Sequence, residues 1–144
     1  MKTKRTILKK SVACLMIIAT LISSFLGTGT IAKASDLVLD EVTGYSYTGV
    51  SPHLSYAITH DPFYIMKVDG KKVFCVESGI LADTGGGYIP EAYVNAKKDI
   101  LSKITYYGFT MTSQSNYNYT VIQIMIWEEL GDQYISSTIP NYEQ

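Results

Sequence analysis

The chain has 144 residues, which is enough for one domain, and it carries 12 basic and 13 acidic side chains. Six of the basic residues and none of the acidic ones lie in residues 1–34. The remainder therefore holds six positive and thirteen negative charges, a net charge of −7, and no arginine. A nucleic-acid-binding domain needs a basic footprint, so this composition excludes nucleic acid as the partner.

The first 34 residues have the layout of a secretory signal peptide. A basic start is followed by an uncharged apolar run, Val12–Leu26, and then by Ala32-Lys33-Ala34, which fits the small-x-small cleavage pattern. A membrane anchor is the alternative, but this run is short of the roughly 20 apolar residues that span a bilayer. We therefore expect an exported, extracellular domain, 35–144.

Cleavage would leave Cys75 as the single cysteine of the exported part, because Cys14 lies in the leader. A single cysteine cannot form an internal disulfide. Its thiol must then be buried and inert, pair between chains or have a special role. All twelve tyrosines also lie in the exported part, which is typical of a β-rich extracellular domain.

The first half of this part predicts short strands. Ser35–Thr43 is expected to form an edge strand. Gly44–Thr59 alternates aromatic or apolar residues with small polar ones, which predicts one or two strands with a turn at Gly49–Pro52.

The clearest local signal is the dipeptide Asp69-Gly70, which lies between two apolar runs within Phe63–Val76. Asp-Gly in this setting predicts a two-residue type I′ hairpin. Pairing outward from the turn sets Met66 against Val73 and Tyr64 against Cys75. These four side chains would share one face of the hairpin, so Cys75 is expected to point into a core or a lined cleft.

The second half predicts helices. After a loop, Glu77–Tyr88, helical spacing indicates one helix over Pro90–Tyr107, with Gly108 as its stop. A polar connector leads to a second helix, Tyr119–Leu130, which is apolar almost all round and ends at Gly131. A partial turn is expected around Ile135 to Pro140. The sequence therefore predicts an α+β domain, in which an antiparallel hairpin, small sheet or barrel packs with two main helices.

Gln123 lies in the middle of the apolar second helix, and Tyr119, Ile126 and Trp127 are its neighbours at helical spacing. An unpaired buried amide costs roughly 1–3 kcal/mol, so a partner is required. Cys75 is the partner that we expect. A thiol beside a carboxamide can form an internal thioester with loss of ammonia. Apolar and aromatic walls would protect such a bond from water, and Tyr64, Tyr119, Ile126 and Trp127 are the candidates for those walls.

Other interpretations of these residues stay open. Cys75 and Gln123 can be ordinary core residues of a non-covalent adhesive or structural domain. A cysteine hydrolase would use Cys75 as the nucleophile and His53 or His60 as the base, but both histidines lie in turn-like polar stretches beside proline. No zinc-ligand spacing is present, so we expect neither a metal nor another cofactor.

Two short motifs add a family resemblance. VFCVES, at Val73–Ser78, resembles the cysteine motif of the thioester domains of Gram-positive surface adhesins. IQIMIWEEL, at Ile122–Leu130, resembles the Thr-Gln-x-Ala-Ile-Trp motif of the same family, and KITYYGF, at Lys103–Phe109, resembles the segment between them. The resemblance covers about Gly44–Asp132. It implies a thioester between Cys75 and Gln123 and covalent coupling, without turnover, to a lysine or other amine on a host or surface protein. It also implies association with a cell surface or cell wall.

Two substitutions and the length of the chain depart from the family pattern. Ile122 stands where threonine is usual, and Met125 stands where alanine is usual and would add bulk beside the pocket. The family's domain also continues well past the glutamine helix, and no wall-anchoring motif is visible here. The resemblance therefore covers the front part of the domain.

Glu77 and Glu128 are candidates for moving a proton during bond formation.

Overall fold

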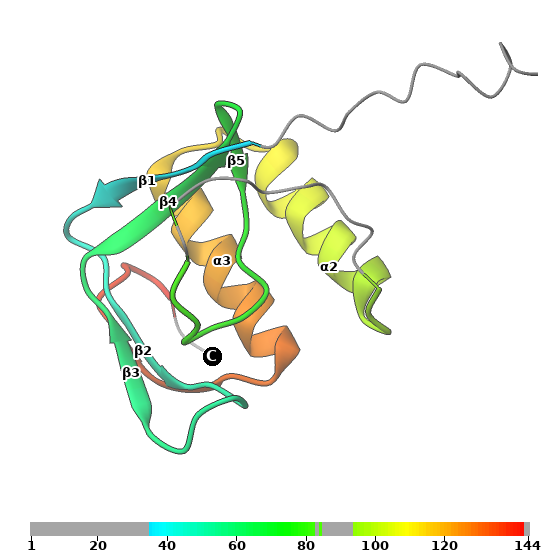
Figure 1. Ribbon diagram of the computed structural model, residues 1–144. Helices are drawn as coiled ribbons and strands as arrows, with labels where there is room; N and C mark the ends of the chain where they lie inside the picture. Colours follow the sequence, from blue (N-terminus) through cyan, green and yellow to red (C-terminus); the bar gives the residue numbers. More distant parts are fainter. Residues whose placement is uncertain (1–34, 83, 85–93, 143–144) are drawn as a thin grey trace, which may run out of the picture. The chain divides into compact units, whose positions relative to one another are not determined.

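The computed structural model describes residues 35–82, 84 and 94–142, which belong to one compact unit, Ala34–Gln144. Two three-stranded antiparallel sheets and two α-helices make up this part of the chain, which confirms the predicted α+β class, and neither sheet closes into a barrel (Figure 1). The predicted leader and the glycine run at 85–87 lie outside the described residues. Within the described ranges, no helix is long and apolar enough to cross a membrane.

The first sheet has the order β1-β4-β5 and contains the predicted hairpin. Its strands are β1 (Leu37–Val42), β4 (Phe63–Val68) and β5 (Lys71–Val73). Asp69 and Gly70 have φ values of 50° and 73°, as a type I′ turn requires, and Met66 pairs with Val73. The turn, the register and the edge strand β1 are therefore confirmed.

The prediction that Cys75 lies on the second hairpin strand, opposite Tyr64, is wrong. Strand β5 ends at Val73, and Tyr64 pairs with Glu41 of β1. Cys75 lies two residues beyond the strand, where its backbone has left the ladder.

The second sheet has the order β3-β2-β6. Its strands are β2 (Tyr47–Val50), β3 (Ala57–His60) and β6 (Gln133–Ser137). One or two strands with a turn at Gly49–Pro52 were expected over Gly44–Thr59. Strands β2 and β3 lie there, but Gly49 lies inside β2 and not in the turn. The partial turn expected around Ile135 to Pro140 is present only at the end of that stretch, at 139–141, because Gln133–Ser137 forms strand β6. Pairing with β2 and a hydrogen bond from Ser137 Oγ to the Ser46 carbonyl (2.9 Å) hold it in place.

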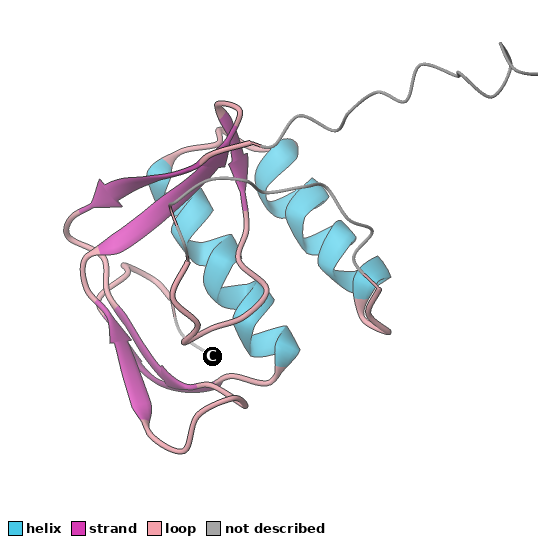
Figure 2. Cartoon of the chain, in the orientation of Figure 1, coloured by secondary structure: helices cyan, strands magenta, loops and turns pink. Residues whose placement is uncertain are grey.

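The two helices lie next to each other in Figure 2, and both differ in their bounds from the predicted ones. Helix α2 spans Lys98–Thr105 and continues as a π-helical segment, η1 (Tyr106–Thr110). Of the predicted helical stretch 90–107, residues 94–97 are not helical and residues 90–93 lie outside the described residues. Gly108 does not stop the helix. A Cβ there would clash with Ile122 Cδ1, so the glycine permits a close approach of η1 to the second helix.

Helix α3 (Asn116–Leu130) is the centre of the core. It begins three residues before the predicted start, because Ser115 Oγ caps it by accepting a hydrogen bond from Asn118 N (3.1 Å). It ends as predicted at Gly131, whose φ of 117° is in the left-handed region. Buried residues occur on almost every side of it, which explains why the sequence shows no polar stripe.

Candidate functional site

Helix α3 places the side chain of Gln123 in the interior, where it is 1% exposed. Its carboxamide makes two hydrogen bonds, and both go to the backbone of Cys75. The N–H of Cys75 donates to Oε1 (2.8 Å), and Nε2 donates to the Cys75 carbonyl (2.7 Å). The structure thus brings together Cys75 and Gln123, which are 48 residues apart in the sequence.

This contact follows from the early end of β5. Beyond Val73 the chain leaves the sheet, so the N–H and carbonyl of Cys75 need partners outside the ladder. The primary amide of Gln123 offers one acceptor and two donors, which is enough to replace a neighbouring strand at this residue. Sequence and geometry therefore agree that the glutamine is a satisfied buried amide.

Phe74 and Tyr119 fix the backbone just before the cysteine. The two rings stack with centroids 4.8 Å apart, and Phe74 also packs edge-on against Phe109 (5.3 Å). The Tyr119 hydroxyl accepts a hydrogen bond from Met66 N (3.1 Å) and donates one to the Val73 carbonyl (2.6 Å). Tyr119 lies one turn before Gln123 on α3, so this part of the helix is hydrogen-bonded to both strands of the hairpin.

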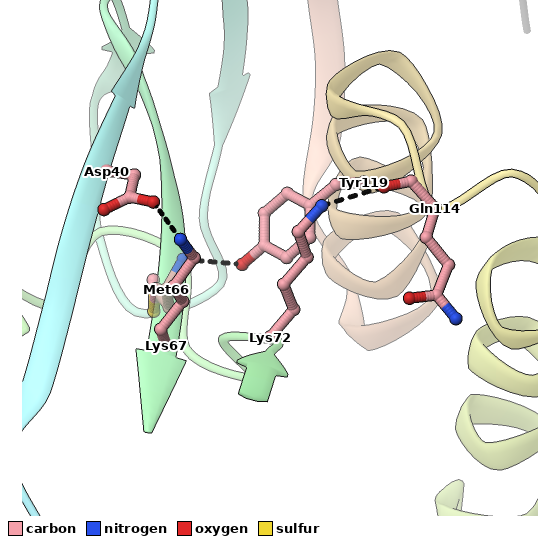
Figure 3. A network of polar contacts seen from close by, with 6 residues as sticks. All are labelled: Asp40, Met66, Lys67, Lys72, Gln114 and Tyr119. Carbon is pink, nitrogen blue, oxygen red and sulfur yellow. Dashed lines mark hydrogen bonds and ion pairs between the residues drawn. The ribbon is translucent and has the colours of Figure 1, made fainter. Parts of the chain in front are cut away.

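Figure 3 shows the Tyr119 hydroxyl directed at β4, together with two further polar contacts of the hairpin. Lys72 Nζ donates to the Gln114 carbonyl (2.8 Å), in the connector before α3. Lys67 forms an ion pair with Asp40 and so joins β4 to β1. The hairpin that leads to Cys75 is therefore bound both to the connector before α3 and to strand β1.

The thiol of Cys75 is in an environment that favours its neutral form. It donates to the Glu77 carbonyl (3.2 Å). Burial raises the pKa of the thiol, and the carboxylates of Glu77 and Asp132 raise it further. The backbone of Glu77 and the indole of Trp127 oppose this rise in pKa. The indole N–H makes no hydrogen bond within the described part of the chain, so its influence on the sulfur is that of a nearby dipole.

A cavity of about 380 Å³ has both Cys75 and Gln123 in its wall. Of the predicted shielding residues, Tyr64 and Trp127 line this cavity, whereas Tyr119 and Ile126 do not and are buried in the core beside it. The wall is mostly apolar and comes from β1, β3, β4, the turn between β3 and β4, the loop after Cys75 and α3. Besides the residues already named, it includes Leu39, Ile58, Thr59, His60, Asp61, Pro62, Phe63, Met66, Glu77, Gly79, Ile80, Leu81 and Ala82.

The two predicted proton carriers differ in their positions. Glu77 lines the cavity, and its backbone carbonyl accepts from the thiol. Glu128 is not part of the cavity wall, and its carboxylate accepts a hydrogen bond from the Tyr142 hydroxyl (2.8 Å). Of the two candidates, only Glu77 therefore lies in the cavity wall with Cys75 and Gln123.

His60 does not lie in a turn-like stretch, as the sequence suggested, but at the end of strand β3 in the cavity wall. Its ring stacks on Trp127 with centroids 4.4 Å apart and an interplanar angle of 26°. Its Nε2 is buried and has no hydrogen-bond partner among the described residues. Burial lowers the pKa of the imidazole, whereas the other histidine, His53, is exposed.

Sequence reasoning missed Asp132 and the segment Gly79–Ala82. Asp132 is 8% exposed and follows the glycine that ends α3. Burial, followed by the charge of Glu128, raises the pKa of this carboxyl. The segment contributes Ile80 and Leu81 to the cavity wall. Two large apolar residues inside an otherwise polar loop were the signal in the sequence.

The described residues contain no group of three or more His, Cys, Asp or Glu side chains that could hold a metal ion. The two departures from the glutamine motif also lie away from the cavity. Ile122 is buried and packs against Gly108, and Met125 is 39% exposed. The expectation that Met125 adds bulk beside the pocket is therefore wrong, because the cavity wall does not include it.

Comparison with known proteins gave one structural likeness to report. No protein-family model and no curated protein sequence matches the chain. Among solved structures, the chain is similar to the thioester domain of the Staphylococcus aureus TIE protein, with a TM-score of 0.51 and 21% sequence identity. The match covers 72% of this chain and 46% of that one. The chain therefore has a thioester-domain-like fold, and it spans less than half the length of the domain that it resembles.

Proposed function

We propose that this chain is a covalent binding domain of the exported, surface-adhesin type, in which Cys75 and Gln123 form an internal thioester. The bond would be consumed once, when an amine on a host or surface protein attacks it. The observation that carries the proposal is the double hydrogen bond between the Gln123 carboxamide and the Cys75 backbone, beside a largely apolar cavity. The likeness of fold to a solved thioester domain supports it.

The contacts of Gln123 suit the formation of the bond. The thiol sulfur attacks Gln123 Cδ, the C–N bond breaks, and the thiol proton leaves on ammonia. Negative charge develops on Oε1 in the tetrahedral intermediate, and the Cys75 N–H at 2.8 Å is the donor that stabilises it. The Cys75 carbonyl orients the amide nitrogen that becomes the leaving group. Both groups are backbone atoms, so they need no rearrangement to act.

The cavity supplies the second requirement, which is protection of the bond from water. Trp127 and Tyr64 line it, with the apolar side chains of Leu39, Ile58 and Met66. A thioester in such surroundings reacts with water slowly, whereas a lysine side chain can bring its amine in on a long alkyl stem.

The hydrolase interpretation fits the electrostatics less well. A catalytic cysteine of that type is a thiolate paired with a protonated histidine, which lowers the pKa of the thiol. Here burial raises the pKa of Cys75 and lowers the pKa of His60. Both groups are therefore neutral near pH 7, which suits a domain that binds once better than an enzyme with turnover.

The deciding experiment is the intact mass of the protein, expressed from the full sequence and denatured before measurement, beside the Cys75→Ala variant. We expect the wild type to lack the mass of one ammonia and the variant to have its full mass. Methylamine should convert the wild type to an adduct. The same spectrum also tests removal of residues 1–34.

A full mass in a folded wild-type sample would contradict the proposal. Cys75 and Gln123 would then be core residues of a non-covalent adhesive or structural domain. Cys75→Ala is a suitable control, because the backbone atoms that hold Gln123 remain when the thiol is removed.

A further inference from the structure

We propose that His60 is the general base of the capture reaction, taking a proton from the incoming amine and returning it to the sulfur of Cys75. This inference rests on the proposed thioester. It gives a chemical role to a histidine that the sequence would leave as a solvated surface residue.

The position of His60 carries the inference. Its side chain and that of Cys75 line the same cavity, and its ring stacks on Trp127, whose indole acts on the thiol. The Nε2 atom is buried without a hydrogen-bond partner in the described part of the chain. A buried acceptor without a partner is unusual in a folded protein. The atom has almost no accessible surface, so the proposed proton transfer requires the imidazole to turn toward the cavity when the amine enters.

The other titratable groups in the cavity wall are less suitable as the base. Asp61, Tyr64 and Glu77 also line it, and all three are exposed. The ring of Tyr47 stacks on the imidazole of His60, with centroids 6.1 Å apart. Burial raises the pKa of the Tyr47 hydroxyl, so this hydroxyl stays protonated. Among these groups, the imidazole alone combines a buried acceptor atom with a place in the cavity wall.

Each bond and proton in the proposed step is accounted for. The amine nitrogen attacks the acyl carbon of Gln123, and His60 Nε2 accepts the proton that the nitrogen must lose. The C–S bond then breaks, with its electron pair going to the sulfur. The imidazolium gives its proton to that sulfur, so the products are an amide at Gln123, a thiol at Cys75 and a neutral imidazole.

Burial makes both proton transfers useful. It lowers the pKa of His60, so the imidazole is neutral and ready to accept a proton near pH 7. It raises the pKa of Cys75, so a thiolate is a poor leaving group in this cavity unless it is protonated as it departs. A base that becomes an acid one step later meets both needs.

The test is the pH dependence of methylamine uptake by the purified protein, followed by intact mass. Each rate is divided by the fraction of methylamine that is unprotonated, which removes the titration of the nucleophile. For the wild type, we expect this normalised rate to be constant near neutral pH and to fall as His60 becomes protonated in acid. His60→Gln and His60→Phe should both show a flat profile. Their uptake rates should be lower than that of the wild type by a factor of up to about 100, which is the low end of general-base catalysis. His60→Phe keeps a ring against Trp127, and His53→Gln is the matched control and should behave as the wild type.

Several results would overturn the role of His60. One is a wild-type normalised rate that stays flat into the acid range, a measurement that needs no variant. Another is uptake by His60→Gln or His60→Phe within about threefold of the wild type, well inside the effect of a general base. A slower His60→Phe that keeps the acid fall of the wild type would also count against it. Absence of the ammonia deficit in the wild type is a separate result, which contradicts the thioester itself.

Discussion

Replacing Tyr119 by phenylalanine tests whether the hydroxyl on α3 holds the hairpin that leads to Cys75. Met66 and Val73 are paired across the hairpin, and the hydroxyl bridges the N–H of one and the carbonyl of the other. The variant keeps the ring, which stacks on Phe74 and is fully buried. The change therefore removes two hydrogen bonds and almost no apolar contact.

The expected cost follows from the two backbone groups that lose this partner. Leaving a buried donor or acceptor unsatisfied costs about 1–3 kcal/mol, so two such groups predict a loss of about 2–6 kcal/mol in the free energy of unfolding. Urea denaturation followed by Trp127 fluorescence measures it. We also expect slower or incomplete formation of the thioester, because the backbone of Cys75 is less firmly held.

Tyr117→Phe is the matched control on the same helix. Its hydroxyl donates to the Pro140 carbonyl (3.0 Å) at an exposed position, where water replaces the lost donor. We expect a cost below about 1 kcal/mol. If the two variants lose the same stability within about 0.5 kcal/mol, the hydroxyl of Tyr119 does not hold the hairpin and the argument is refuted.

Three further changes test other parts of the description. Met125→Ala should leave methylamine uptake unchanged, and a changed rate would place this side chain beside the reacting atoms after all. Gly108→Ala should lower the free energy of unfolding, measured by urea denaturation, by about 1–3 kcal/mol. Adding Ile122→Val should recover part of that loss, because valine lacks the Cδ1 that the new Cβ would meet. Strictly additive effects of the two changes would disprove the contact. The pKa of His60 in the folded chain lies below its value of 6.5 in the unfolded chain. In the pH range between these two pKa values the unfolded chain binds more protons, so the free energy of unfolding falls as the pH drops through that range. His60→Phe should show a smaller loss of stability between about pH 7.5 and about pH 5, and an equal loss would contradict burial of the imidazole.

The parts of the fold that the sequence predicted correctly are those specified by neighbouring residues. Asp69 and Gly70 set the hairpin and its register, because their left-handed backbone is compatible with only one kind of tight turn. Gly131 ends α3 for a similar local reason. The pairing of Gln123 with Cys75, 48 residues away, is the exception. A buried amide needs a partner, and the family resemblance of the two motifs indicated which residue it is.

The parts that the sequence did not predict depend on contacts between distant residues. Strand β6 is extended because β2 offers it a pairing edge, and its own residues show no alternation. Gly108 looked like a helix stop, but it is required by the approach of Ile122 from another helix. His60 looked solvated because its partners, Trp127 and Phe63, come from elements that a sequence cannot bring near it.

The contacts of Gln123 are common to a core amide and to a thioester precursor, so the distinction between the two rests on the surroundings of the thiol. A core amide needs only the two hydrogen bonds to Cys75. It does not need a cavity of about 380 Å³ with the cysteine in its wall, nor a buried imidazole without a partner there. An unpaired buried acceptor also weakens a fold. The presence of both features together, beside the one cysteine of the described residues, is what a site for a reacting amine requires and what a packed core does not.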